Sequence, residues 1–343
     1  MADASATNAQ DAMTAEEAAF KLQATGINSD GHRVLLGCPG PSYHFEAVNS
    51  IIRAITQTPL AKFVHLSNSC DTWDAFNDVW VTALNLCEMG QYTHFAMLHS
   101  DIAAQGQWLN ELLGELDKTG AALVSAIAPI KDRRGVTSSG IGDPENCWGP
   151  LRRFTMAELD KFPETFNATH AGYPGGILLH NTGCWVADMR HPCFYKTDET
   201  GALRCNFDFR HRIYREPERE NRWINVRESE DWYFSRQIHE LGGISYITRK
   251  AKLYHLGTTE FPNWGPWGNY QEGDLDTMKK WNPERWAELQ KEAAEKPQEN
   301  VALIPAGDLV TAHDWGYKPP EPEASPSATA EDTNATGPSD NEA

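Results

Sequence analysis

Short apolar runs alternate with segments of helical periodicity over residues 33–127, and this alternation constrains the fold more than any other feature. Runs typical of buried strands occupy 33–38, 62–66, 94–98 and 122–127. Helical segments lie between them, at about 43–57, 71–86 and 108–118. The alternation predicts an α/β fold with a mainly parallel sheet and crossover helices. In such sheets ligands bind at the carboxyl ends of the strands, so the loops there are the first candidates for a site.

Each predicted helix carries an apolar face that we expect to cover the sheet. In the first helix this face consists of Val48, Ile51, Ile52 and Ile55. In the second it consists of Phe76, Val79, Trp80, Ala83 and Leu84. In the third it consists of Leu109, Leu112, Leu113 and Leu116, and Gly120 is a plausible end for that helix.

The rest of the chain is less regular. Strand-like pieces at 175–180, 206–213 and 244–255, with helical segments near 229–241 and 277–289, indicate a smaller mixed sheet packed on the first half. Residues 1–30 are polar and Ala-rich, and residues 318–343 are acidic and rich in Pro, Ser and Ala. Neither terminus has the apolar content of a core, so we expect disordered extensions around one folded domain at 31–317.

Charge and cysteine content restrict the partners and the compartment. The chain has 30 Lys+Arg against 48 Asp+Glu, a net charge of −18, which argues against nonspecific nucleic-acid binding over the whole surface. Segment 204–227 is locally different, with seven Arg and four acids, and is expected to be an exposed hairpin or a contact for an anionic acceptor. An odd number of cysteines without a CxxC pair, no signal-like start and no apolar run of roughly 18–20 residues predict a cytoplasmic protein.

The sharpest chemical signal is His99-Ser100-Asp101, which directly follows the apolar run 94–98. A carboxylate at the end of a buried strand needs a helix N-terminus, a base or a cation as its partner. A hard divalent cation accepts carboxylate oxygen and still leaves coordination positions for phosphate oxygens. The alternative is that Asp101 caps the next helix, although the distance in sequence to Trp108 makes that less natural.

Acids also crowd a predicted helix start at Glu228-Ser229-Glu230-Asp231, immediately before Trp232-Tyr233-Phe234. The helix dipole favours acids there, so ordinary capping accounts for the pattern. However, Glu230 and Asp231 point in different directions, and one of them should face inward beside the aromatic residues. A carboxylate in a cleft can accept a proton from an attacking hydroxyl group.

Two further segments carry chemistry-bearing side chains. His255 lies in Tyr254-His255-Leu256-Gly257, before the aromatic, Gly-rich run 261–268. Neutral imidazole is a common metal ligand, but a lone histidine is more often structural. The aromatic run 261–268 either forms a loop that closes over a sugar or packs against the rest of the protein. Lys131 lies in 129–135 with two arginines, after the fourth strand, where the basic groups either meet phosphate or form a solvated turn.

Taken in order, these features resemble GT-A-fold glycosyltransferases of the large inverting family two. The resemblance spans roughly residues 32–270 and rests on the strand and turn Gly37-Cys38-Pro39-Gly40, on His99-Ser100-Asp101, on the Ser-Glu-Asp-Trp helix start and on the later His-Leu-Gly. Segments 76–80, 129–132 and 181–185 also resemble uncharacterised bacterial and phage proteins of this group. One departure is that His99 stands in the place of the first acid of the family's DxD motif.

The resemblance implies a GT-A-like, Rossmann-type sheet with a smaller acceptor-side part. It assigns a divalent cation, Mn²⁺ or Mg²⁺, to Asp101 and His255, and the catalytic base to Asp231 with Glu230 as its neighbour. The contacts it implies for a nucleotide-sugar donor, with a UDP-sugar expected, are Cys38, Pro39, Gly40, Asn77, His99, Ser100 and Lys131. Those on the acceptor side are Trp185, Trp232 and Trp264.

The expected function is therefore metal-dependent, inverting transfer of a sugar to a hydroxyl acceptor, which is a glycan, a protein, a lipid or modified nucleic acid. Two alternatives stay open. The first is a non-catalytic nucleotide-sugar or glycan-binding protein of the same fold, which His99 favours. The second is a nucleotidyltransferase, which ranks lower because the first loop lacks a Gly-rich, Lys-containing signature.

Overall fold

The computed structural model describes residues 31–40, 42–58, 62–66, 72–217 and 221–270, with isolated positions between 284 and 295. The expected extensions at 1–30 and 318–343 lie outside these ranges, and so does the expected helix at 277–289 apart from those isolated positions.

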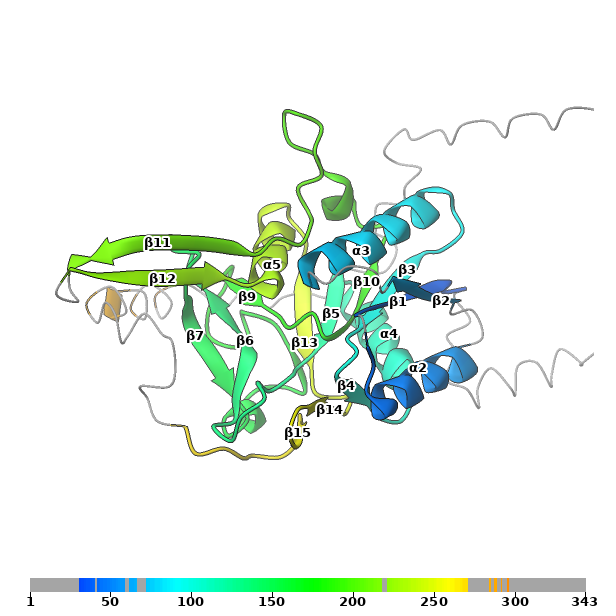
Figure 1. The fold of residues 1–343 in the computed structure, drawn as a ribbon, viewed down its shortest axis with the longest axis horizontal. Coiled ribbons are helices and arrows are strands. Elements are labelled where there is room, and N and C mark those ends of the chain that lie inside the picture. Colours follow the sequence, from blue (N-terminus) through cyan, green and yellow to red (C-terminus); the bar gives the residue numbers. More distant parts are fainter. Residues whose placement is uncertain are drawn as a thin grey trace, which may run out of the picture.

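The described part of the chain contains helices and strands in alternation over its first half and mainly strands thereafter (Figure 1). The α-helices are α2 (Phe45–Gln57), α3 (Thr72–Glu88), α4 (Trp108–Thr119) and α5 (Glu230–Glu240). The strands are β1 (Val34–Pro39), β2 (Lys62–Leu66), β3 (His94–Leu98), β4 (Ile102–Ala104), β5 (Leu123–Ala126), β6 (Val136–Gly142), β7 (Pro150–Thr155), β8 (Thr165–Phe166), β9 (Ile177–Leu179), β10 (Cys184–Asp188), β11 (Arg210–Glu216), β12 (Arg222–Glu228), β13 (Ser245–Thr248), β14 (Leu253–Leu256) and β15 (Glu260–Pro262). Among the described residues, no helix combines the length and the apolar character needed to cross a bilayer.

The central sheet has the strand order β2-β1-β3-β10-β5-β13-β8. The α/β class is confirmed, and the central sheet is mixed: β2, β1, β3, β5 and β13 run in one direction, whereas β10 and β8 run in the other. β1 runs parallel to β2 and β3, and β5 runs parallel to β13, whereas β10 is antiparallel to both of its neighbours and β8 is antiparallel to β13. The physical reason is the path of the chain. After β5 it builds β6 to β9, and it then returns between β3 and β5 from the opposite direction.

Helices cover both faces of the central sheet. Successive side chains of a strand point to opposite faces, so each central strand contributes to two cores. Leu36 and Leu98 join the core beneath α2 and α4, whereas Leu35 and Met97 join the core beneath α3 and α5. All five apolar residues expected on one face of α3 are buried in the second core, as predicted.

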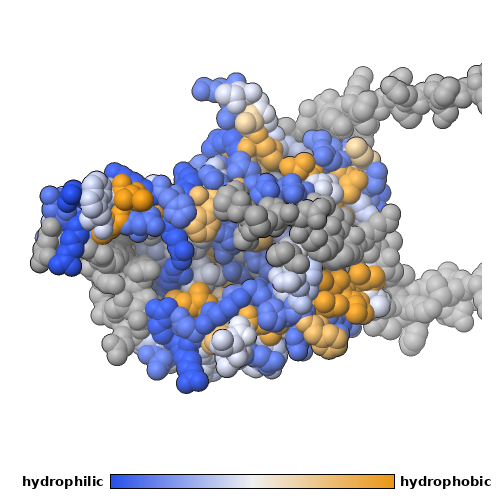
Figure 2. Space-filling model, viewed as in Figure 1, coloured by the Kyte–Doolittle hydropathy of each residue, from blue (hydrophilic) through white to orange (hydrophobic). Residues whose placement is uncertain are grey.

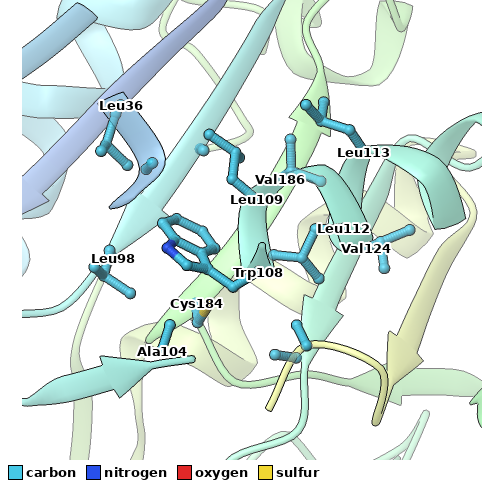
Figure 3. Close-up of a cluster of buried hydrophobic side chains, with 14 of the residues drawn as sticks. Leu36, Leu98, Ala104, Trp108, Leu109, Leu112, Leu113, Val124, Cys184 and Val186 are labelled. Carbon is cyan, nitrogen blue, oxygen red and sulfur yellow. The ribbon is translucent and has the colours of Figure 1, made fainter. Parts of the chain in front are cut away.

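Helix α4 closes the first core as its sequence predicts. Its four expected leucines are buried, and the helix ends at Gly120, which has a left-handed φ of 61° and donates its N–H to the Leu116 carbonyl. Trp108 lies at the start of α4 with its ring against the sheet, close to Leu98 and Cys184 (Figure 3). The indole N–H donates to the Ser50 carbonyl at 3.0 Å, so this core ring keeps a polar partner.

Helix α2 turns a different face to the core from the one expected. Only Ile51 of the four predicted core residues is buried, together with the small side chains of Ala47, Ser50 and Ala54. Val48, Ile52 and Ile55 are exposed, and an apolar surface over α2 is visible in Figure 2. The close approach of α2 to β4, where the Ser50 hydroxyl reaches the Ala104 carbonyl at 3.0 Å, leaves room only for small residues.

Three smaller antiparallel sheets complete the described structure. β7, β6 and β9 form one, β15, β14 and β4 form another, and β11 and β12 form a hairpin that extends from the body (Figure 1). The sheet of β4 and β14 matters most for the site, because it joins the segment after β3 to a segment far along the chain.

Gly37 offers a test of the packing of β1. A Cβ atom at this position would lie 2.7 Å from the Phe95 ring, which is itself enclosed by Trp80 and Trp185. We expect Gly37→Ala to lower the free energy of unfolding by about 1–3 kcal/mol, measured by urea denaturation. Gly114→Ala is the matched control, because nothing lies within 4 Å of its added Cβ on α4, and it should stabilise by about 0.5–1 kcal/mol. A Gly37→Ala protein as stable as the wild type would contradict this packing.

Candidate functional site

Residues from distant parts of the sequence meet just beyond the carboxyl end of β3. Asp101 lies between β3 and β4, and β4 pairs with β14 so that Ile102 is opposite His255. The Leu256 N–H donates to the Asp101 carbonyl at 2.8 Å. This pairing places His255 Nε2 3.6 Å from Asp101 Oδ2, so the structure brings together the two residues expected to bind the metal.

The orientation of His255 is fixed by its other ring nitrogen. Nδ1 lies 2.7 Å from the Pro129 carbonyl, to which Nδ1–H donates, and Nε2 is therefore the nitrogen that faces Asp101. Lys131, two residues after Pro129, pairs its Nζ with the same Asp101 oxygen. The segment after β5 thus supplies both the group that orients His255 and a mobile positive charge beside Asp101.

Asp101 carries a firmly ionised carboxylate. Burial alone would raise its pKa, but the contacts with His255 and Lys131 and the nearby imidazole of His99 together hold the pKa well below its ordinary value. Its second oxygen, Oδ1, is buried and has no hydrogen-bond partner. A carboxylate with one buried, unpartnered oxygen and the other 3.6 Å from an oriented imidazole nitrogen fits a divalent cation.

Asp101 and His255 would supply two protein ligands to the cation. Within the described ranges, no third His, Cys, Asp or Glu comes within ligand distance of both Asp101 and His255. The remaining coordination positions of Mn²⁺ or Mg²⁺ would be left to phosphate oxygens and water, which is the usual arrangement for Mg²⁺ at phosphate substrates.

Asp231 is the second residue of α5 and is buried. Its carboxylate accepts a hydrogen bond from the Thr182 hydroxyl and another from Asn181 Nδ2 at 3.2 Å. Burial raises the pKa of Asp231, and the Thr182 bonds and the charge of His255 oppose that rise. A carboxyl with a raised pKa, supported on one side by two donors, is suited to accept a proton.

The loop 181–183 connects Asp231 to the metal-binding side. The His99 N–H donates to the Gly183 carbonyl at 2.8 Å, while the neighbouring Thr182 holds Asp231. Asn181 stabilises the loop by accepting from the Gly183 N–H at 2.8 Å and donating to Ser138 Oγ at 2.7 Å. Asn181 and Thr182 were assigned no role from the sequence. The sequence feature that could have identified them is the polar Asn-Thr-Gly directly before the buried strand β10. From the sequence, β10 was not predicted as a strand.

The loop after β1, which contains Gly40, contacts the segment that carries Asp101 through its backbone. Gly40 has a φ of 140°, and a Cβ there would lie 2.9 Å from Ser100 Oγ, so this loop packs directly on the loop that carries Asp101. The His44 N–H also donates to the Ser100 carbonyl at 3.0 Å. Cys38 and Pro39 are buried, and burial raises the pKa of the Cys38 thiol well above its ordinary value. Of the expected contacts in this loop, only Gly40 retains accessible surface for a ligand.

His99 and Asn77 differ in whether their polar side-chain atoms already have hydrogen-bond partners. The His99 ring lies 4.5 Å from the Phe76 ring, and its Nε2 is buried without a hydrogen-bond partner. Burial lowers the pKa of His99 to about 4, so the ring is neutral near pH 7. Asn77, in contrast, uses both of its amide groups on the backbone of Phe207, at 2.7 and 2.9 Å. The structure therefore gives Asn77 a loop-anchoring role and leaves His99 with an unsatisfied polar atom.

The three tryptophans expected on the acceptor side lie in three different environments. Trp185 is fully buried between Trp80, Phe95 and Phe234, so it is a core residue and not an acceptor contact. Trp232 is almost fully buried, donates its N–H to the Ser138 carbonyl at 2.7 Å and has the Arg153 guanidinium 4.5 Å above its ring.

Trp264 borders a cavity of about 390 Å³ together with Gln105, Lys252 and Tyr254. Tyr254 and His255 are consecutive in β14 and therefore point to opposite faces. The cavity is thus on the face of the small sheet opposite to His255. Trp264 therefore lies on a different face of that sheet from the Asp101–His255 pair.

The start of α5 is fixed by a buried ionic cluster. Glu228, the last residue of β12, is fully buried between Arg210, whose Nε lies 2.8 Å from Glu228 Oε2, and Arg236, whose Nε lies 2.9 Å from Oε1. Arg236 also donates to the Asp143 carbonyl at 2.6 Å. These ion pairs connect the base of the β11–β12 hairpin to α5 at Glu228, two residues before Glu230 and three before Asp231.

The folded stability should depend on the ionisation of Glu230. Burial, and then the charge of Asp231, raise its pKa from the ordinary 4.5 to about 8. Between these values the folded state keeps a proton that the unfolded chain releases, so this group lowers stability as the pH rises from about 4.5 to 8. Glu230→Gln should therefore gain stability relative to the wild type at pH 8 and much less at pH 5, as measured by urea denaturation. Glu240→Gln, at the exposed end of α5, is the control, and an equal difference at both pH values for Glu230→Gln would contradict the assignment.

The described residues thus form a cluster of Asp101, His255 and Lys131 and, joined to it by loop 181–183, the buried Asp231 at the start of α5. Comparison of the chain with protein-family models and with curated proteins finds no match.

Proposed function

We propose that this protein is a metal-dependent glycosyltransferase that moves a sugar from a nucleotide-sugar donor to a hydroxyl acceptor with inversion of configuration. The observation that carries the proposal is the meeting of Asp101 and His255 at the end of β3, with an oriented imidazole nitrogen 3.6 Å from a carboxylate oxygen. A second, proton-accepting carboxylate, Asp231, is linked to that place through loop 181–183.

On the donor side, Asp101 and His255 would hold Mn²⁺ or Mg²⁺. The cation, when bound, supplies positive charge to the leaving diphosphate. Lys131 pairs with Asp101 through a partly exposed side chain, so its ammonium group is free to turn to a phosphate oxygen once Asp101 has another cation. His99 Nε2 is a buried polar atom without a partner beside this place, and Gly40 keeps some accessible backbone surface there.

On the acceptor side, Asp231 receives the proton of the attacking hydroxyl group. The acceptor oxygen forms a bond to the anomeric carbon, the bond from that carbon to the diphosphate oxygen breaks, and its electron pair leaves with the diphosphate. Attack in line with the leaving group inverts the configuration. Thr182 and Asn181 hold the carboxylate in place, and the pKa raised by burial makes Asp231 a stronger base than an exposed aspartate.

A second candidate is a protein of the same kind that binds the nucleotide sugar without turnover. The neutral, buried ring of His99 in place of an acid favours it, because one ligand oxygen fewer is offered to the cation and to the ribose. The two candidates differ in whether a nucleoside diphosphate is released.

Replacement of Asp101 tests the donor side. With a panel of nucleotide sugars, we expect one donor to raise the melting temperature of the wild type mainly when Mn²⁺ is present. Asp101→Asn should lose the Mn²⁺-dependent part of that shift and weaken donor binding by more than about tenfold. Asp78→Asn, at an exposed position of α3, should behave as the wild type. Mn²⁺-dependent donor binding that survives in Asp101→Asn would contradict the assignment.

Replacement of Asp231 tests the chemical step. Asp231→Asn keeps the shape of the side chain but removes its basicity, so donor affinity measured by calorimetry should be kept while release of the nucleoside diphosphate falls by about 10²–10⁴-fold. Glu240→Gln, on the same helix, is the control. Unchanged release in Asp231→Asn would exclude it as the base. A wild-type protein that binds the donor but releases no diphosphate with any acceptor would favour the binding-only candidate.

A further inference from the structure

A second group of metal-type ligands lies at the opposite end of β3 from Asp101. It consists of His32, just before β1, His94, the first residue of β3, and Asp117, in the last turns of α4. One ligand atom from each of the three residues lies within 4.8 Å of the other two. β3 alone separates His94 from Leu98 by roughly 13 Å at 3.3 Å per residue, so this group is distinct from the one at Asp101.

The three side chains are already oriented toward one another. His32 Nε2 lies 3.0 Å from Asp117 Oδ1, and the His32 and His94 rings are 4.4 Å apart, edge to face. His94 Nδ1 is 2.8 Å from the Thr93 hydroxyl, which orients this ring and leaves Nε2 as the nitrogen without a hydrogen-bond partner. Histidine ligands of metals are oriented by just such a hydrogen bond from the second ring nitrogen.

His94 Nε2 is the observation that points to a ligand. It is completely buried and has no hydrogen-bond partner, and leaving a buried ring nitrogen unpaired costs free energy. Asp188 is opposite His94 in the sheet, but its carboxylate is held by Arg190 through two contacts of 2.7 Å. A cation between His94, His32 and Asp117 would satisfy the nitrogen without disturbing that pair.

The donor set selects the kind of cation. Two imidazole nitrogens and one carboxylate oxygen are the ligands that Zn²⁺ takes in three-residue sites, with a fourth position left for water. Mg²⁺ and Ca²⁺ prefer oxygen ligands, so a set with two imidazole nitrogens suits Zn²⁺ better than either of them. A tetrahedral site requires ligand atoms about 3.3 Å apart, from bonds of about 2.0 Å, which small rotations of the side chains would provide.

We propose that His32, His94 and Asp117 form a Zn²⁺ site. The ion joins the segment before β1, the start of β3 and the end of α4, three parts of the chain that are otherwise connected at this corner by the His32–Asp117 pair and by backbone contacts of Arg33 with Thr93 and His94. Its binding free energy would add to the stability of the first core.

The proposal is tested with Co²⁺ as a visible probe for Zn²⁺, on the full chain after removal of metals with a chelator. The wild type should bind one Co²⁺ at this site with the strong visible absorption of a tetrahedral centre, and Zn²⁺ should displace it and raise the melting temperature. Asp117→Ala changes a partly exposed residue and should keep the fold, yet it should weaken binding by more than about tenfold and remove the tetrahedral spectrum. His32→Gln, tested in parallel, should do the same.

Asp101→Asn is the matched control, because it removes a carboxylate from the other group and should leave the tetrahedral spectrum unchanged. Absence of a tetrahedral Co²⁺ spectrum in the wild type would overturn the proposal. So would a spectrum and a Zn²⁺-dependent rise in melting temperature that persist in both Asp117→Ala and His32→Gln. Loss of the spectrum in Asp101→Asn alone would assign the ion to the other group and overturn it as well.

Discussion

The pairing of β10 with β3 is the constraint on which both the core and the site depend. β10 enters the sheet antiparallel between β3 and β5, with Cys184 opposite Leu98 and Trp185 opposite Met97. A shift of this register by one residue would turn Trp185 out of the aromatic core and move Thr182 away from Asp231. The packing of a buried strand therefore also sets the position of the loop that holds the proposed base.

Two carboxylates near this loop experience opposite environments. Burial would raise the pKa of Asp101, but its contacts with His255 and Lys131 outweigh burial, so its pKa falls. Asp231 is buried with hydrogen-bond donors but no paired cation, so its pKa rises. Environments that drive the pKa values of neighbouring acids apart are typical of sites that divide two tasks between them. Here one carboxylate is suited to a cation and the other to a proton.

The regular part of the fold was predictable because its signals are local. α3 and α4 present their apolar residues at helical spacing, and their buried faces follow directly from the sequence. α2 has apolar residues on more than one side, so periodicity alone could not select the face that meets β4. β10 has no alternating pattern because it is buried on both faces, and β4 and β8 are too short to give one.

The site was predictable where a residue type and its position at a strand end were sufficient. Asp101 was chosen in this way, whereas His255 was assigned to the metal only through the resemblance, and the two lie together. Trp185 was chosen as an aromatic residue near a motif, and only the three-dimensional packing distinguishes a core ring from a surface ring. The roles of Thr182 and Asn181 depend on a long-range contact with α5, which no local pattern encodes.

The β11–β12 hairpin has a consequence for how such a protein diversifies. Along one of its faces His211, Ile213, Arg215, Trp223, Asn225 and Arg227 are exposed, and the Arg215 guanidinium lies 4.5 Å above the Trp223 ring. Its base is fixed by Glu228 and two arginines, while its outer part contributes nothing to the core clusters. Substitutions in the outer part should therefore leave the position of Asp231 unchanged, so that the exposed surface of the hairpin can vary independently of the base of α5.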